Sequence, residues 1–284
     1  MSNVEGDGWD FLSGREAEAV DGIREDLGDQ PWAQQLLRQI PATADLTRAD
    51  KALLFELRFA GALHRAGIVP RYEVTGEGNS TLDFAFESGD REWRVELMRL
   101  EETEAALRAI VQRIEDGIRW IGRILTTNAG DRRQSEEGET LKAVQRICQK
   151  CELKGRAYKF PLPDEAYQAL LVDFRTFLHG GDEFDRVHVG LGGHHLPEEF
   201  HRRYWEGQLI TGVFDARTKV AGAEFIRERV HFIGFVNEEA YDAGDFGSAV
   251  QFIANPHLFA SAKEVHAAMA TWPLQPYRLL NGAD

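Results

Sequence analysis

The chain is poor in cysteine and has no long apolar run, and each absence excludes a class of protein. Two of its 284 residues are cysteines, which argues against a disulfide scaffold. No apolar run approaches the roughly 18 residues that a membrane-spanning helix needs. The first residues are acidic and lack the basic-then-apolar order of a signal peptide. We therefore expect a cytoplasmic protein.

The two cysteines lie close together, as Cys148 and Cys151, so a zinc site has to be considered. A structural zinc site generally needs four ligands, and the sequence has no second pair of this kind. Ligands could come from His194, His195 and His201, the first two of which end a glycine-rich segment. That segment lacks the Lys-Ser/Thr of a phosphate-binding loop. A surface loop, and two cysteines on a helix, are the simpler interpretations.

The net charge of −14 is spread unevenly along the chain. Residues 1–50 hold 11 acids and 4 bases, whereas residues 131–160 hold 5 acids and 8 bases, a net charge of +3. An acidic protein is a poor nonspecific binder of nucleic acid, because contacts with phosphates supply that affinity. If the partner is nucleic acid, we expect the basic segment to contact it, and a partner subunit or a homo-oligomer to add basic surface.

The pattern of apolar residues, glycines and caps predicts an α/β protein in which a central mixed sheet is flanked by helices. We expect an acidic helical N-terminal extension over residues 1–45, and one α/β domain over 46–284 with a core over about 51–178 and a C-terminal continuation over 179–284. The predicted helices cover about 15–27, 32–40, 47–66, 102–127, 139–153, 198–205 and 261–269. The predicted strands cover about 69–74, 82–86, 93–97, 169–174, 187–190, 230–236 and 249–253.

Two of these strands carry acids among alternating apolar residues. Asp83 alternates with apolar side chains in the strand 82–86, and Glu96 does so in the strand 93–97. A short turn through Gly89 predicts that the two strands pair as a hairpin. Pairing can then bring both carboxylates to one face, where they form natural ligands for Mg²⁺. Such a metal can activate water and neutralise charge at a phosphate.

Three runs, Phe55-Glu56, Thr81-Leu82-Asp83-Phe84 and Val95-Glu96-Leu97-Met98, resemble the PD-(D/E)XK nuclease superfamily, the fold of many restriction endonucleases. The resemblance covers about Leu53–Phe174. It implies a restriction endonuclease-like core of order α-β-β-β-α-β. It also implies Mg²⁺ or Mn²⁺ bound by Asp83 and Glu96, with Glu56 as a third catalytic acid that supports the metal through a water. The implied substrate is nucleic acid, DNA before RNA, and the implied context is genome defence or repair.

The chain departs from the pattern at Met98, which stands where the family has a lysine. That lysine is expected to orient the attacking water and to stabilise charge, and a thioether can do neither. Arg94 shares the face of Glu96, but a guanidinium cannot act as a general base. Arg99 should point into the opposite layer. A lysine from a neighbouring helix is the remaining replacement.

The predicted helix 139–153 offers such cations. Lys142, Arg146, Lys150 and Lys154 recur every four residues and would form one basic stripe, with neighbours about 6 Å apart. The stripe could follow a phosphate backbone, and the alternative is an ordinary solvated helix face. Asp173, on a buried strand, is interpreted as a hydrogen-bonded strand end rather than a fourth catalytic acid.

Three hypotheses follow from the sequence. The first is a metal-dependent nuclease that hydrolyses phosphodiester bonds. The second, motivated by Met98 and by the acidic charge, is a catalytically degenerate relative that binds a protein or nucleic-acid partner. The third is an unrelated α/β protein in which Asp83 and Glu96 lie apart on the surface.

Overall fold

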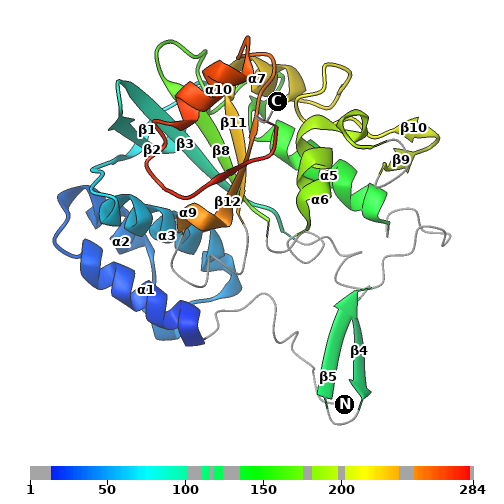
Figure 1. Cartoon of the computed structure of the whole chain (residues 1–284). Helices are drawn as coiled ribbons and strands as arrows, with labels where there is room; N and C mark the ends of the chain where they lie inside the picture. The colour runs from blue at the N-terminus through cyan, green and yellow to red at the C-terminus, as the bar shows by residue number, and fades with distance from the viewer. Residues whose placement is uncertain are drawn as a thin grey trace.

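A computed structural model of the chain describes residues 14–101, 110–115, 118–123, 135–174, 181–197, 202–236 and 246–281. Its centre is a mixed seven-stranded sheet with helices on both faces (Figure 1). In spatial order the strands are β1 (Arg71–Thr75), β2 (Thr81–Ser88), β3 (Arg91–Arg99), β8 (Tyr167–Asp173), β11 (Phe232–Val236), β12 (Val250–Ala254) and β13 (Arg278–Leu279). The α/β class and the mixed sheet are therefore as predicted.

The sheet combines two kinds of pairing. The strands β1, β2 and β3 form an antiparallel meander, as do β11 and β12. The strand β8 is parallel to both of its neighbours, β3 and β11, and β12 is parallel to β13. Because β8 is central and covered on both faces, it is an almost continuous apolar run, Ala169-Leu170-Leu171-Val172.

Helices cover both faces and divide the core into two apolar clusters. One face carries α1 (Gly14–Leu27), α2 (Gln34–Gln39), α3 (Lys51–Arg65), α9 (Phe246–Ala249) and α10 (Ala262–Met269). The other face carries α5 (Glu136–Gln149), α6 (Glu183–Leu191) and α7 (Ala223–Arg229). Short 3₁₀ turns lie at Pro31–Ala33, Thr43–Asp45, Arg48–Asp50 and Gly193–His195.

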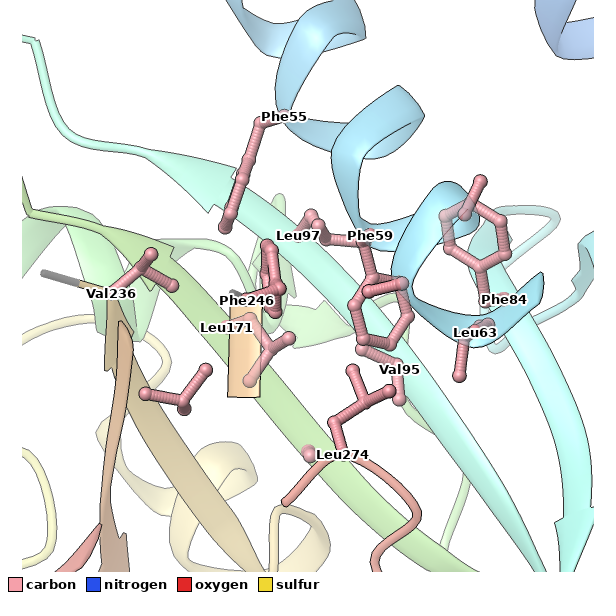
Figure 2. Packing of buried hydrophobic residues seen from close by; sticks show 14 of the residues in the cluster. Phe55, Phe59, Leu63, Phe84, Val95, Leu97, Leu171, Val236, Phe246 and Leu274 are labelled. Carbon is pink, nitrogen blue, oxygen red and sulfur yellow. The ribbon is translucent and has the colours of Figure 1, made fainter. Parts of the chain in front are cut away.

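Helix α3 is held by aromatic packing on the first face. Figure 2 shows Phe55 and Phe59 pointing from α3 toward the side chains of the sheet. The ring of Phe59 meets that of Phe84 edge-on, with 5.3 Å between centroids, and lies 5.4 Å from that of Phe246. Buried phenylalanines of this size each contribute roughly 1.5–3 kcal/mol of burial free energy. This packing fixes α3, and with it Glu56, relative to β2 and β3.

The predicted N-terminal extension is part of this packing. Val20, Ile23 and Leu27 of α1 are buried in the same cluster as α3. A Cβ on Gly61 would lie 2.7 Å from the side chain of Ile23, so glycine permits the close approach of α1 and α3. Within the described residues, no helix is long and apolar enough to span a membrane.

Three small hairpins lie outside the main sheet. They are β4–β5 (Ile110–Glu115 and Ile118–Arg123), β6–β7 (Glu152–Leu153 and Arg156–Ala157) and β9–β10 (Tyr204–Trp205 and Gln208–Leu209). In Figure 1 the β4–β5 hairpin projects from the body of the molecule. The helix predicted over 102–127 is therefore wrong for 110–115 and 118–123, while its other residues lie outside the described ranges. The apolar residues Ile110, Val111 and Ile114 have helical spacing, but all three are β-branched and favour strands, which the helical interpretation overlooked.

Two further predictions need correction. The strand predicted over 187–190 is part of α6, because Asp182 and Asp185 form a capping box that begins a helix and outweighs the β-branched pair Val187 and Val189. The helix predicted over 198–205 is wrong at its end, where Tyr204 and Trp205 form β9, and residues 198–201 lie outside the described ranges.

Candidate functional site

The two strand acids lie where β2 and β3 stop pairing. The register of this hairpin runs from the pair Ser88–Arg91 to the pair Phe84–Val95. Asp83 precedes Phe84 and Glu96 follows Val95, so both acids lie one residue beyond the last pair. Oδ2 of Asp83 accepts a hydrogen bond from the amide of Leu97 at 2.6 Å. The Asp83 carboxylate thus pairs with a main-chain N–H of β3 just beyond the last β2–β3 backbone pair. This contact holds Asp83 beside Glu96.

Glu56 reaches the same place from α3. The hydroxyl of Tyr72, on β1, donates a hydrogen bond to its Oε2 at 2.7 Å. The Tyr72 ring packs on Phe84, with 5.3 Å between centroids, so the tyrosine is itself fixed by the first core cluster. The three acids named from the sequence therefore line one pocket, in which β1 supplies the residue that positions Glu56.

Two lysines from outside β3 contact Glu96, although Met98 on β3 itself supplies no cation. The ammonium groups of Lys150 and Lys159 lie 2.8 Å and 2.9 Å from Oε1 of Glu96. The side chain of Glu96 is 1% exposed, and its Oε2 has no hydrogen-bond partner among the described residues. One carboxylate oxygen is thus held by two cations, while the other is buried and lacks a donor.

Lys159 is the site residue that the sequence analysis missed. It follows β7 with a left-handed backbone (φ 65°), and its ammonium also donates to the carbonyl of Thr81 at 2.7 Å. A Cβ on Gly76 would lie 2.4 Å from the Lys159 carbonyl, so glycine allows this segment to approach the β1–β2 turn. Its place in the basic segment 131–160 is its one sequence signal, since it belongs to no helical or strand repeat.

The predicted basic stripe is broken. Helix α5 ends at Gln149, Lys150 is its C-cap, and Lys154 lies beyond it in the turn of the β6–β7 hairpin. Lys142 pairs with Glu139 at 3.5 Å, away from Glu96. The helix thus ends four residues before the predicted end at 153, and β6 begins three residues after it. Of the four cations, Lys150 and Arg146 line the pocket.

The other residues considered as substitutes for the lysine behave differently. Arg94 pairs with Glu92 at 2.5 Å and with Asp164 at 3.6 Å, so its charge is used on the strand surface. Arg99 lies on the pocket wall at the end of β3, although alternation placed it in the opposite layer. Arg146 also contributes to the wall, and its guanidinium donates to the carbonyl of Glu101 at 2.7 Å.

Burial and like charge shape the protonation of the site. Burial raises the pKa of Asp83 well above its usual range, and the negative charges of Glu96 and Glu56 raise it further. Burial also raises the pKa of Glu56, against the hydrogen bond from Tyr72. For Lys150, burial lowers the pKa but the charge of Glu96 outweighs it, so the net shift is upward. Lys150 is therefore a stable cation.

These groups line a pocket of about 580 Å³ that opens at the ends of β2 and β3. Its wall consists of Ala49, Ala52, Glu56, Asp83, Glu96, Leu97, Met98, Arg99, Glu101, Arg146, Lys150 and Lys159. The wall thus combines acids with four cations, which come from the end of β3, α5 and the segment after β7. A phosphate together with a bound cation would find complementary charge there.

The donor set fits a hard divalent cation held by few protein ligands. Among the described residues, no three His, Cys, Asp or Glu side chains come together as a metal site, so Asp83 and Glu96 would act as a pair. Mg²⁺ keeps several waters and is often bound by one or two carboxylates, which suits such a pair. Burial and the negative charges of Glu96 and Glu56 disfavour the ionised form of Asp83 and raise its pKa, and a bound divalent cation would stabilise that form.

The described residues contain no cluster of ligands of the kind that a structural zinc site needs. Cys148 and Cys151 are both buried and free, and burial raises the pKa of Cys148 to about 12. His194 and His195 lie in the 3₁₀ turn after α6, and His201 lies outside the described residues. Asp173, the other acid considered, is buried at the end of β8, where its carbonyl accepts from the amide of Leu100.

No protein-family model, no curated protein and no solved structure matches the chain. The functional conclusion therefore depends on the pocket itself, in which Asp83, Glu96 and Glu56 lie together with Lys150 and Lys159.

Proposed function

We propose that the protein is a Mg²⁺- or Mn²⁺-dependent nuclease with a restriction endonuclease-like core, which hydrolyses phosphodiester bonds in nucleic acid, DNA before RNA. The observation that carries this proposal is the pair of lysines on Glu96. They place ammonium groups beside the metal-binding carboxylate, where the PD-(D/E)XK pattern has a lysine and this chain has Met98. The required charge therefore comes from α5 and from the segment after β7.

Each residue then has a role that its surroundings support. Asp83 and Glu96 would hold the divalent cation, which when bound supplies a polarised water and neutralises charge on the phosphate. Lys150 stays protonated, so it stabilises negative charge on the phosphate oxygens and does not remove a proton. Glu56, with one oxygen held by Tyr72, can accept a proton from a water through the other.

A cleavage assay tests the proposal. Supercoiled plasmid and labelled single-stranded DNA and RNA are incubated with Mg²⁺ or Mn²⁺ and either the wild type, Glu96→Gln or Glu92→Gln. The last is a matched control, since Glu92 lies on the same strand but pairs with Arg71 and Arg94 outside the pocket. We expect Glu96→Gln to lose at least about 10³-fold in rate, and Glu92→Gln to stay within about threefold. Equal cutting by all three proteins would refute the assigned site.

A second candidate function is a non-catalytic subunit that binds nucleic acid or a protein partner. It is favoured by the two lysines, whose charges are already engaged by Glu96, and by the net charge of −14. No cutting by the wild type, together with oligonucleotide binding that does not change on addition of Mg²⁺, would support this function over the first. The implied biological context, genome defence or repair, is an analogy with the superfamily only.

A further inference from the structure

The β6–β7 hairpin has a lysine at its turn, in a backbone conformation that favours other residue types. Lys154 and Gly155 form its two-residue turn, and both have positive φ, at 53° and 76°. Such turns prefer Asn, Asp or Gly at the first position, because a longer side chain is strained in the left-handed region. A lysine is present there instead. The fold of the hairpin alone does not explain this choice.

A neighbouring turn of the same protein shows the usual solution. Between β1 and β2, Gly78 and Asn79 occupy the two left-handed positions, with φ of 66° and 59°. The two turns are joined, since Glu77 and Lys159 form a β-bridge and a Cβ on Gly78 would lie 3.0 Å from the carbonyl of Ala157. The β1–β2 turn therefore has the residues that its geometry prefers, whereas the β6–β7 turn has a lysine at the same kind of position.

The hairpin cations are also unpaired. Neither Lys154 nor Arg156 forms an ion pair with any residue that the structure describes, and both are exposed. The one acid on the hairpin, Glu152, is occupied, since its carboxylate accepts from the amide of Gly155. In a chain of net charge −14, two cations separated by one residue and without acidic partners among the described residues present an uncompensated positive surface.

A second pocket, of about 450 Å³, lies between the two turns. It is lined by Gly78, Asn79, Leu153, Lys154, Arg156, Ala157 and Tyr158. The next residue along the chain is Lys159, whose ammonium pairs with Glu96 in the first pocket. One short segment, 153–159, therefore links the buried carboxylate to an open basic pocket with amide and aromatic groups in its wall.

We propose that this second pocket is a polynucleotide subsite: Lys154 and Arg156 bind the phosphodiester backbone of the strand whose scissile phosphate lies at Glu96. The proposal rests on the proposed function for the position of the scissile phosphate, but the binding that it predicts does not require cleavage. It assigns the substrate as a polynucleotide whose backbone contacts both pockets.

Charge reversal with a matched control tests the subsite. Lys154→Glu/Arg156→Glu is compared with Lys219→Glu/Lys263→Glu, which changes net charge equally at two exposed lysines that also form no ion pair with a described residue. Binding of fluorescein-labelled 20-mers, single- and double-stranded, is followed by anisotropy in EDTA, so that cutting cannot interfere. We expect the hairpin variant to bind at least about 10-fold more weakly and the control to change less than about threefold. The salt slope should fall by roughly 1.4–1.8 for two lost phosphate contacts.

The outcomes separate the two proposals. If the hairpin variant binds like its control, or if wild-type protein binds neither 20-mer, the subsite is wrong, whatever the cleavage assay shows. If the hairpin variant loses binding while the wild type cuts nothing, the subsite stands and the nuclease function fails. Circular dichroism melting of each variant checks that the fold is retained.

A single substitution checks the turn argument. Lys154→Asn removes the cation but supplies a residue that the left-handed position prefers. We expect its melting temperature to be unchanged or higher, and its affinity for the 20-mers to fall about three- to fivefold. Unchanged affinity would remove Lys154 from the subsite. A lower melting temperature would contradict the turn argument.

Discussion

Two buried polar centres in the described part of the sheet differ in how their polar groups are paired. At one, around Glu96, carboxylates accumulate, one carboxylate oxygen lacks a donor and two lysines are drawn in. At the other, around Asn255, the Asn255 amide donates to the carbonyls of Arg227 and Val230 at 2.8 Å and 2.7 Å. Its oxygen accepts from the amide of His257 at 3.0 Å.

The two centres differ in charge: the groups around Asn255 are neutral, and those around Glu96 are charged. The Asn255 centre joins the end of β12 to the last turn of α7 and to Val230 after it. Neighbouring His231 is kept neutral because burial lowers its pKa to about 4. Paired neutral groups of this kind stabilise a fold. The Glu96 centre instead holds buried charged groups, which are costly to remove from water. We therefore expect changes at Glu96 and its lysines to affect activity, and changes around Asn255 to affect stability.

The largest expected effect is on catalysis. Lys150→Met should lower the cleavage rate by about 100-fold, roughly 3 kcal/mol of transition-state stabilisation, because it removes a fixed cation beside the phosphate. Adding Met98→Lys to this variant places a lysine on the same strand face as Glu96 and should recover part of the rate. Single-turnover cleavage measures both. A double variant that is no faster than Lys150→Met would show that Lys150 does not replace the missing lysine.

The next effect is on stability. Asn255→Ala should lower the free energy of unfolding by about 2–4 kcal/mol, because the buried carbonyls of Arg227 and Val230 lose their donor. Urea unfolding measures this change. Cleavage per folded molecule should stay within about twofold of the wild type. A large loss of activity in the folded fraction would break the distinction between the two centres.

The two centres should also respond to pH in opposite directions. His231 has a folded pKa of about 4 against an ordinary 6.5, so its contribution is present above 6.5 and is lost as pH falls toward 4, up to about 3 kcal/mol. Asp83 has a raised folded pKa, so without metal its contribution is present below about 3.8 and is lost as pH rises through the folded value.

Urea unfolding between pH 4 and 8, with and without Mg²⁺, follows both effects. The gain in stability from Mg²⁺ should grow with pH, because the cation binds the ionised carboxylates. His231→Asn should flatten the acidic limb alone, and Glu96→Gln should remove the Mg²⁺ effect alone. A Mg²⁺ effect that survives in Glu96→Gln would mean that the cation binds elsewhere.

The smallest effect is expected at Tyr72, which positions Glu56 through one hydrogen bond. Tyr72→Phe keeps the ring packing on Phe84 but removes the hydrogen bond to Glu56. We expect a three- to tenfold loss of cleavage rate with little change in melting temperature. The lower limb of the pH–rate profile should also shift, since that hydrogen bond lowers the pKa of Glu56. A loss without such a shift would indicate a packing role alone.

Local pattern determined the parts of the site that lie on regular elements. Helical spacing placed Glu56 on a helix, and strand alternation with a short turn placed Asp83 and Glu96 together, as the structure has them. The same reasoning failed at α6, where a capping box begins a helix, and at β4, where the apolar residues have helical spacing but form a strand. It also extended α5 too far, and so gave Lys154 a place on a helix that ends at Gln149.

The sequence by itself therefore determined the three acids, their elements and the absence of a lysine at position 98, because those depend on neighbours a few residues apart. Only the tertiary structure decided that Lys150 and Lys159 reach Glu96. The contact depends on where α5 ends and on how closely the glycines of the β1–β2 turn let the segment after β7 approach. A buried carboxylate recruits whichever cation the folded chain brings within reach, and no local repeat encodes that distance.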